Sequence, residues 1–168
     1  MEINLSRQER IFRSLVQHYN HDRYWRYRAV VIDPEKGSKL GDMFRLLYIK
    51  RCDAYNNASM GTHRNFGAQF ATPPHFPHGI YGIVLSHNVV VGRNSFIFHN
   101  VTIGEGKNGA PVIGDNVYIG TGAILIGNIR IGNNVRIGAG CVVCCDVPDN
   151  ATVVAEKPKI IMRTQNEE

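Results

Sequence analysis

The 168-residue sequence has no long hydrophobic run and no leader-like N-terminus. No eighteen consecutive residues are apolar, and no charged stretch at the start is followed by an apolar one. A membrane-spanning helix needs about 20 such residues, and a secretory signal needs that two-part pattern. We therefore expect a soluble, cytoplasmic protein without membrane insertion.

Cysteine is scarce, with only Cys52, Cys141, Cys144 and Cys145. The run from Cys141 to Cys145 resembles half of a metal site, but a structural zinc ion takes about four ligands. No matching Cys or His pair lies nearby in the sequence. We expect these thiols to pack or to lie on the surface, Cys141 as a small buried residue, and we expect no metal.

The excess of positive charge is modest, at +5. A balance of this size is compatible with nucleic acid, with an anionic cofactor or with solubility alone. The sequence contains no helix-turn-helix pattern, no zinc finger and no aromatic-basic stacking motif. We therefore expect no nucleic-acid partner.

The dominant positive feature is a six-residue repeat that begins near residue 79 and ends near residue 148. Neither a helix nor a two-residue strand alternation produces this spacing. A short repeat of fixed period is typical of a β-solenoid. The first register holds Leu85, Val91, Ile97, Ile103, Ile113, Ile119, Leu125, Ile131, Ile137 and Val143, with four extra residues between Ile103 and Ile113. A second register holds Val89, Ser95, Val101, Val117, Ala123, Ile129, Val135, Cys141 and Val147.

Residues 1–55 precede the repeat and are predicted to be helical. Ser6 and Glu9 form a possible capping box, residues 21–31 suggest an amphipathic helix with arginines lying along an aromatic face, and residues 40–52 suggest another. Residues 56–163 are assigned to the solenoid, with an irregular start, and residues 164–168 to a frayed tail. Because exposed strand edges pair with other chains, we expect the helices to cover one end of the solenoid and residues 151–163 the other.

Several motifs resemble those of the hexapeptide-repeat acyltransferases. Residues 113–123 (IGDNVYIGTGA) and 137–140 (IGAG) carry this resemblance, and residues 78–84 (HGIYGIV), 101–104 (VTIG) and 106–109 (GKNG) narrow it to the serine acetyltransferase-like branch. The resemblance implies a left-handed parallel β-helix of triangular section, with three hexapeptides in each coil. It also implies homotrimers, with acetyl-CoA bound in grooves between subunits.

Stacked coils place equivalent residues in vertical columns about 4.8 Å apart. The second position after the leading aliphatic gives one such column: Tyr81, His99, Thr121, Ala139 and, if the repeat continues, Lys157. In a fold of this kind the column suits an elongated anionic thioester. An alternative is that the small residues only satisfy tight corners.

The predicted acetyl-CoA-binding residues follow from this column: Thr121, Gly122, Ala123, Ala139, Gly140, Lys157 and Lys159. Small residues allow a pantetheine chain to approach the backbone. The two lysines are placed to meet phosphates.

Acyl transfer needs a base that accepts the proton of the attacking acceptor, and imidazole titrates in the useful range. By resemblance, His78 aligns with the histidine that heads the family's His-x-x-Gly-Ile-Val segment. His99 is the second catalytic candidate, because the column places it beside the same groove. Two departures from the branch stand out: Pro77 replaces the usual preceding aspartate, and the loop at residues 105–111 lacks a histidine.

The resulting hypothesis is an acetyl-CoA-dependent O-acetyltransferase of a small hydroxylated acceptor, either serine or a sugar of a surface polysaccharide or its nucleotide-linked precursor. The alternative is a sugar or nucleotide-sugar O- or N-acetyltransferase of surface polysaccharide synthesis. A zinc-dependent hydratase of the carbonic anhydrase type usually has two histidines five residues apart, and no pair here has that spacing. A non-catalytic trimeric scaffold is the remaining alternative.

Overall fold

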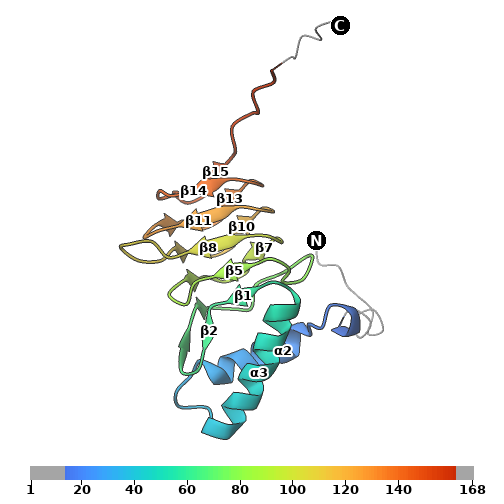
Figure 1. Cartoon of the computed structure of the whole chain (residues 1–168). Helices are drawn as coiled ribbons and strands as arrows, with labels where there is room; N and C mark the ends of the chain where they lie inside the picture. The colour runs from blue at the N-terminus through green and yellow to red at the C-terminus, as the bar shows by residue number, and fades with distance from the viewer. Residues whose placement is uncertain (1–13, 162–168) are drawn as a thin grey trace, which may run out of the picture.

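The computed structural model describes residues 14–161, so the predicted capping box at Ser6 and Glu9 lies outside the described part. Two helices, α2 (His21–Val31) and α3 (Lys39–Tyr55), lie at one end of a stack of short strands (Figure 1). Asn20 caps α2 by accepting a hydrogen bond from the Arg23 N–H at 2.9 Å, and Ser38 caps α3 through the Gly41 N–H at 3.3 Å. Both helices expected from residues 21–31 and 40–52 are confirmed.

The strands form three parallel sheets that wrap around one core, as expected for a β-solenoid. Sheet I contains β1 (Ser59–Met60), β5 (Val84–Leu85), β8 (Thr102–Gly104), β11 (Ile124–Ile126) and β14 (Val142–Val143). Sheet II contains β7 (Phe96–Ile97), β10 (Tyr118–Ile119), β13 (Arg136–Ile137) and β15 (Thr152–Val153). Sheet III contains β4 (Gln69–Phe70), β6 (Val90–Val91), β9 (Val112–Ile113) and β12 (Arg130–Ile131). A small antiparallel hairpin of β2 (Thr62–His63) and β3 (Phe66–Gly67) lies beside the helices.

Both predicted registers point inward. Every aliphatic residue of the first register is buried, and the second register is buried throughout, including Ser95 and Cys141. The four-residue insertion is also confirmed, because Val90 pairs with Val112 across 22 positions whereas Val112 pairs with Arg130 across 18. The core is therefore continuous along the stack.

One corner of the solenoid is built from stacked asparagines. Asn94, Asn116, Asn134 and Asn150 all have positive φ, between 54° and 62°. Each of the first three donates a side-chain hydrogen bond to the next asparagine along the stack, at 3.0 to 3.2 Å. Asparagine suits this corner because it tolerates the left-handed conformation and its amide can pair with a copy of itself.

A buried arginine is one of the links between the helices and the first coil. Arg28 of α2 is only 2% exposed. It donates hydrogen bonds to Thr62 Oγ1 at 3.0 Å and to the carbonyl oxygens of Met60 and Ala68 at 3.1 and 2.5 Å. Arg28 lies along the aromatic face as expected, with its guanidinium carbon 5.3 Å from the Trp25 ring centroid and 4.7 Å from that of Phe70. The expectation that its charged end reaches solvent is wrong, because these three oxygens satisfy the guanidinium inside the protein.

The other end of the stack is not covered as expected. β15 pairs with β13, but residues 154–161 form no strand and the chain runs away from the stack (Figure 1). All eight of these residues are exposed. The prediction that residues 151–163 cover this end is therefore wrong for residues 154–161, whereas β15 adds a strand to sheet II and the partly buried Ala151 and Val153 pack against the core.

Candidate active site

The structure brings His78 and His99 together. Their ring centroids are 5.3 Å apart and the rings are nearly perpendicular, at 79°. His78 is exposed, whereas His99 is half-buried. The two histidines predicted to be catalytic thus share one place on the surface, at the corner between sheet II and sheet I.

The backbone at this corner confirms four members of the predicted column. The Tyr81 carbonyl accepts from the Asn100 N–H at 3.0 Å, the His99 carbonyl from the Gly122 N–H at 3.1 Å, and the Thr121 carbonyl from the Gly140 N–H at 2.9 Å. These bonds repeat the same geometry at successive coils. Tyr81, His99, Thr121 and Ala139 therefore stack.

His78 reaches His99 because the coil below contains extra residues. His75 bridges to Phe96 across 21 positions, whereas Val84 pairs with Thr102 across 18. The extra residues lie between His75 and Tyr81 and form a turn that includes Gly79, whose φ of 77° favours glycine. Sequence reasoning missed this local insertion, although the two glycines flanking Ile80 and Tyr81 signal a turn.

Aromatic rings continue from the histidine pair along the outer surface of sheet II. Phe98 lies 5.7 Å from His78 and 4.9 Å from Tyr118, measured between ring centroids. The guanidinium carbon of Arg136 lies 6.0 Å from the Tyr118 ring centroid. Sequence reasoning did not single out these residues, because outward positions of a solenoid carry no periodic constraint.

One polar atom of the pair has no hydrogen-bond partner among residues 14–161. His99 Nδ1 is buried, and no donor or acceptor of the described chain reaches it. A buried N–H without a partner is rarer in proteins than a buried acceptor without one. This nitrogen is therefore better left as a bare lone pair than as an N–H.

The small residues above His99 form an open surface at the same corner. Thr121 and Gly122 are half-buried, and Ala139 and Gly140 are exposed. At Gly122 and Gly140, with φ of 70° and 68°, no atom lies within 4 Å of the position that a β-carbon would take. The turn conformation explains why glycine stands at both places, and the free space leaves room for a bound chain.

The structure corrects the predictions made for Ala123 and Lys157 in the cofactor site. Ala123 is fully buried, and its backbone N–H and carbonyl already bond to Gly120 and Thr102. The pairing of Ile137 with Val153 places Ala155 above Ala139, so the prediction that Lys157 continues the column is wrong. The last coil is two residues shorter than the repeat requires, and Lys157 and Lys159 lie beyond it on the exposed segment.

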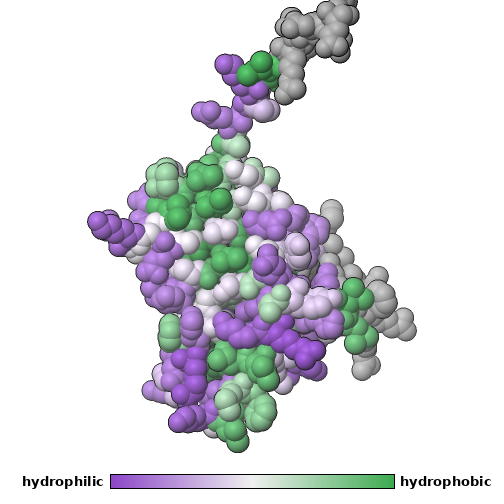
Figure 2. All heavy atoms as spheres, viewed as in Figure 1, coloured by the Kyte–Doolittle hydropathy of each residue, from purple (hydrophilic) through white to green (hydrophobic). Residues whose placement is uncertain are grey.

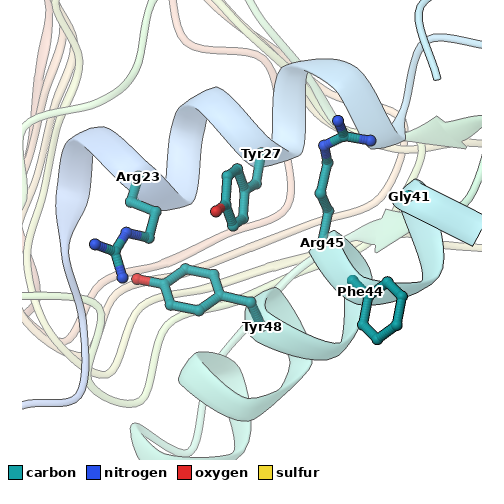
Figure 3. A pocket seen from close by; sticks show the side chains of 6 residues that line it. All are labelled: Arg23, Tyr27, Gly41, Phe44, Arg45 and Tyr48. Atoms are coloured by element: carbon teal, nitrogen blue, oxygen red, sulfur yellow. The ribbon is translucent and has the colours of Figure 1, made fainter. Parts of the chain in front are cut away.

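A separate hollow of about 410 Å³ lies between α2 and α3 (Figure 3). It is lined by Arg23, Tyr27, Gly41, Phe44, Arg45 and Tyr48. Burial raises the pKa of the Tyr48 hydroxyl to about 12. The hollow shares no residue with the histidine pair and contains no group suited to proton transfer near neutral pH.

No helix within residues 14–161 is long and apolar enough to cross a membrane. No three His, Cys, Asp or Glu side chains of the range converge as metal ligands would.

The repeat is similar in sequence to known transferases. Residues 110–145 match the family described as bacterial transferase hexapeptide (six repeats), which confirms the predicted hexapeptide-repeat fold. The chain is 42% identical over 90 residues to a serine acetyltransferase of Buchnera aphidicola subsp. Schizaphis graminum (strain Sg), which covers 51% of this chain and 34% of the relative. It is 46% identical over 86 residues to an Escherichia coli (strain K12) protein named for a proposed acetyltransferase role in colanic acid biosynthesis, with coverage of 49% and 52%.

A solved structure extends the similarity to the helices. The serine acetyltransferase of Brucella abortus strain S19, in complex with coenzyme A, has a TM-score of 0.61 and 28% identity, and the match covers 90% of this chain and 56% of that one. The chain spans about a quarter to three fifths of the length of the curated relatives it matches.

Proposed function

We propose that this hexapeptide-repeat protein is an acetyl-CoA-dependent O-acetyltransferase of a small hydroxylated acceptor, with His78 as the general base. The observation that carries the proposal is the meeting of His78 and His99 at the foot of an open column of small residues. The similarity to serine acetyltransferases supports the same chemistry.

In this mechanism the acceptor hydroxyl attacks the thioester carbonyl carbon while His78 takes the hydroxyl proton. The carbonyl electron pair moves to oxygen and forms a tetrahedral intermediate. Collapse of that intermediate breaks the C–S bond, and the proton held by His78 returns to the departing thiolate. His78 suits this role because its exposed ring is accessible to an acceptor.

The pantetheine arm of acetyl-CoA is proposed to lie along the open column above His99. Thr121, Gly122, Ala139 and Gly140 leave the backbone accessible there. Lys157 and Lys159 follow the last coil on an exposed segment and are proposed to meet the phosphates, although they lie beyond the column. The coenzyme A complex of the Brucella relative supports a site of this kind.

A homotrimer is part of the proposal, because sheet I presents apolar side chains to solvent. Val84, Thr102, Ile124 and Val142 stack along its outer surface, and the three aliphatic members are 42%, 37% and 66% exposed. Apolar residues gather over β11 and β14 (Figure 2). A neighbouring subunit on this surface would place a groove along the edge that carries His99.

Two acceptors are candidates. L-Serine is favoured by the serine acetyltransferase relatives, whereas a sugar of a surface polysaccharide is favoured by the similarity to the Escherichia coli relative. Pro77 and the histidine-free loop at residues 105–111 depart from the serine-specific pattern, and this keeps the sugar as a second candidate.

Free-thiol release from acetyl-CoA, measured with L-serine and with a panel of sugars and nucleotide sugars, tests the proposal. We expect acceptor-dependent release with one of these classes, and calorimetric binding of coenzyme A at millimolar concentration or tighter. Absence of both transfer and coenzyme A binding would leave the non-catalytic scaffold as the function.

A further inference from the structure

We infer that His99 is a neutral hydrogen-bond donor that stabilises the oxyanion of the reaction, and is not a second base. This inference deepens the proposed function and rests on it. It starts from the buried Nδ1 of His99, which has no partner among residues 14–161.

The burial of this atom selects the tautomer of the ring. A neutral imidazole carries one N–H and one bare nitrogen. A proton on Nδ1 would leave a buried donor unsatisfied, and orphaned buried N–H groups are rarer in proteins than under-satisfied buried acceptors. The favoured neutral form of His99 therefore carries its proton on Nε2.

The same tautomer prevents His99 from acting as the base. Its only free lone pair is on Nδ1, which is buried and cannot take a proton from the acceptor substrate. The other ring nitrogen, Nε2, which carries the N–H, is not one of the buried atoms without a partner. His99 then offers a donor where His78 offers a lone pair, and the two adjacent rings have different roles.

The substrate, and not His78, is the partner of the Nε2–H. A hydrogen bond from His99 to a ring nitrogen of His78 would occupy a lone pair, and His78 would then carry its proton on the nitrogen needed for catalysis. No hydrogen bond joins the two rings in the described structure, where they meet edge to face at 5.3 Å between centroids. The thioester carbonyl oxygen becomes negative beside His78 during the attack. This oxygen is the hydrogen-bond acceptor for the Nε2–H that the site lacks before substrate binds.

The reaction balances with this assignment. Attack forms a C–O bond and places the carbonyl electron pair on oxygen, where the His99 N–H donates to it. Collapse returns the pair and breaks the C–S bond. His99 neither gains nor loses a proton in either step.

Two amide substitutions separate the two ring nitrogens. A glutamine side chain at position 99 can place its amide nitrogen near the position of Nε2, whereas the shorter asparagine places it near that of Nδ1. We expect His99→Asn to lower kcat by about 10²- to 10³-fold, the usual loss of one oxyanion donor, and His99→Gln to lower it by less than about tenfold. Coenzyme A affinity, measured by calorimetry, should change in neither variant.

Long-range ¹⁵N NMR of the histidines in the whole chain gives an independent readout, with His99→Gln used to assign the signal. We expect the Nε2–H tautomer for His99 at neutral pH, and an Nδ1–H form or an imidazolium would overturn the inference. Equal loss of activity in folded Asn and Gln variants would also overturn it. A wild-type protein that transfers acetyl to no acceptor would instead overturn the proposed function itself, whatever the tautomer.

Discussion

At the scale of single residues, the most perturbed carboxyl group of the described chain lies in α3. Asp53 is 4% exposed and accepts a hydrogen bond from the Tyr24 hydroxyl at 2.6 Å. Burial raises the pKa of Asp53 to about 6, and the bond from Tyr24 offsets only part of that rise. The second carboxylate oxygen has no partner among residues 14–161.

Asp53 therefore makes stability depend on pH. The folded protein holds this proton more tightly than the unfolded chain, whose aspartate pKa is about 3.9. The contribution of Asp53 to the free energy of unfolding is greatest below pH about 4, falls as the pH rises to about 6, and is constant above. We expect Asp53→Asn to remove this dependence, so that the stability difference between wild type and variant changes by about 1–3 kcal/mol across that window.

Urea denaturation at a series of pH values measures this difference, with the exposed Asp22→Asn as control. Parallel stability curves for wild type and Asp53→Asn would show that the buried carboxyl does not titrate in this range.

At the scale of elements, Arg28 decides how α2 attaches to the first coil. Its replacement by methionine keeps most of the apolar stem but leaves Thr62 Oγ1 and the carbonyl oxygens of Met60 and Ala68 without their guanidinium donor. We expect Arg28→Met to lower the free energy of unfolding by about 2–4 kcal/mol. The exposed Arg26→Met should change it by less than about 0.5 kcal/mol. Chemical denaturation of the two variants compares them, and similar values would mean that the buried bonds do not stabilise the junction.

The asparagine corner gives a second prediction at this scale. Asn134 combines a φ of 57° with side-chain hydrogen bonds to Asn116 and Asn150. We expect Asn134→Ala to destabilise the protein by about 1–2 kcal/mol, because alanine is strained at positive φ and cannot pair. Asn134→Gly loses only the side-chain hydrogen bonds, because glycine adopts positive φ without strain, and it should destabilise the protein less than Asn134→Ala. Thermal unfolding ranks the variants, and a glycine variant less stable than the alanine variant would contradict the role given to φ.

The repeat was predictable because its inward side chains must recur with the spacing of the coil. The same logic predicted the stack of Tyr81, His99, Thr121 and Ala139. It failed for Lys157, because a coil two residues shorter moves Ala155 into the column, and nothing in the outward residues signals that change. Arg28 was missed for a different reason: its partners are two backbone oxygens and the Thr62 hydroxyl, all more than thirty positions away, which leave no local pattern.

At the scale of the whole molecule, the outer surface of sheet I is the feature that predicts assembly. Ile124 lies in the middle of this surface, between Thr102 and Val142 in neighbouring strands. We expect wild type to elute with about three times the 18.8 kDa mass of one chain. Ile124→Arg should shift it towards the monomer, because a buried unpaired charge is costly.

Val112→Arg is the matched control, since this valine has similar exposure, 39% against 37% for Ile124, but lies on sheet III. Size-exclusion chromatography with light scattering gives the masses. A monomeric wild type, or equal effects of both substitutions, would show that sheet I is not the surface through which subunits contact one another.

The proposed chemistry depends on the imidazole of His78, and steady-state acetyl transfer by His78→Gln tests it most directly. We expect kcat to fall by about 10²- to 10⁴-fold, the usual contribution of a general base, with coenzyme A affinity unchanged. His87→Gln, at an exposed histidine against His63 and Phe66, should retain wild-type transfer. A His78→Gln protein with wild-type turnover would contradict the account.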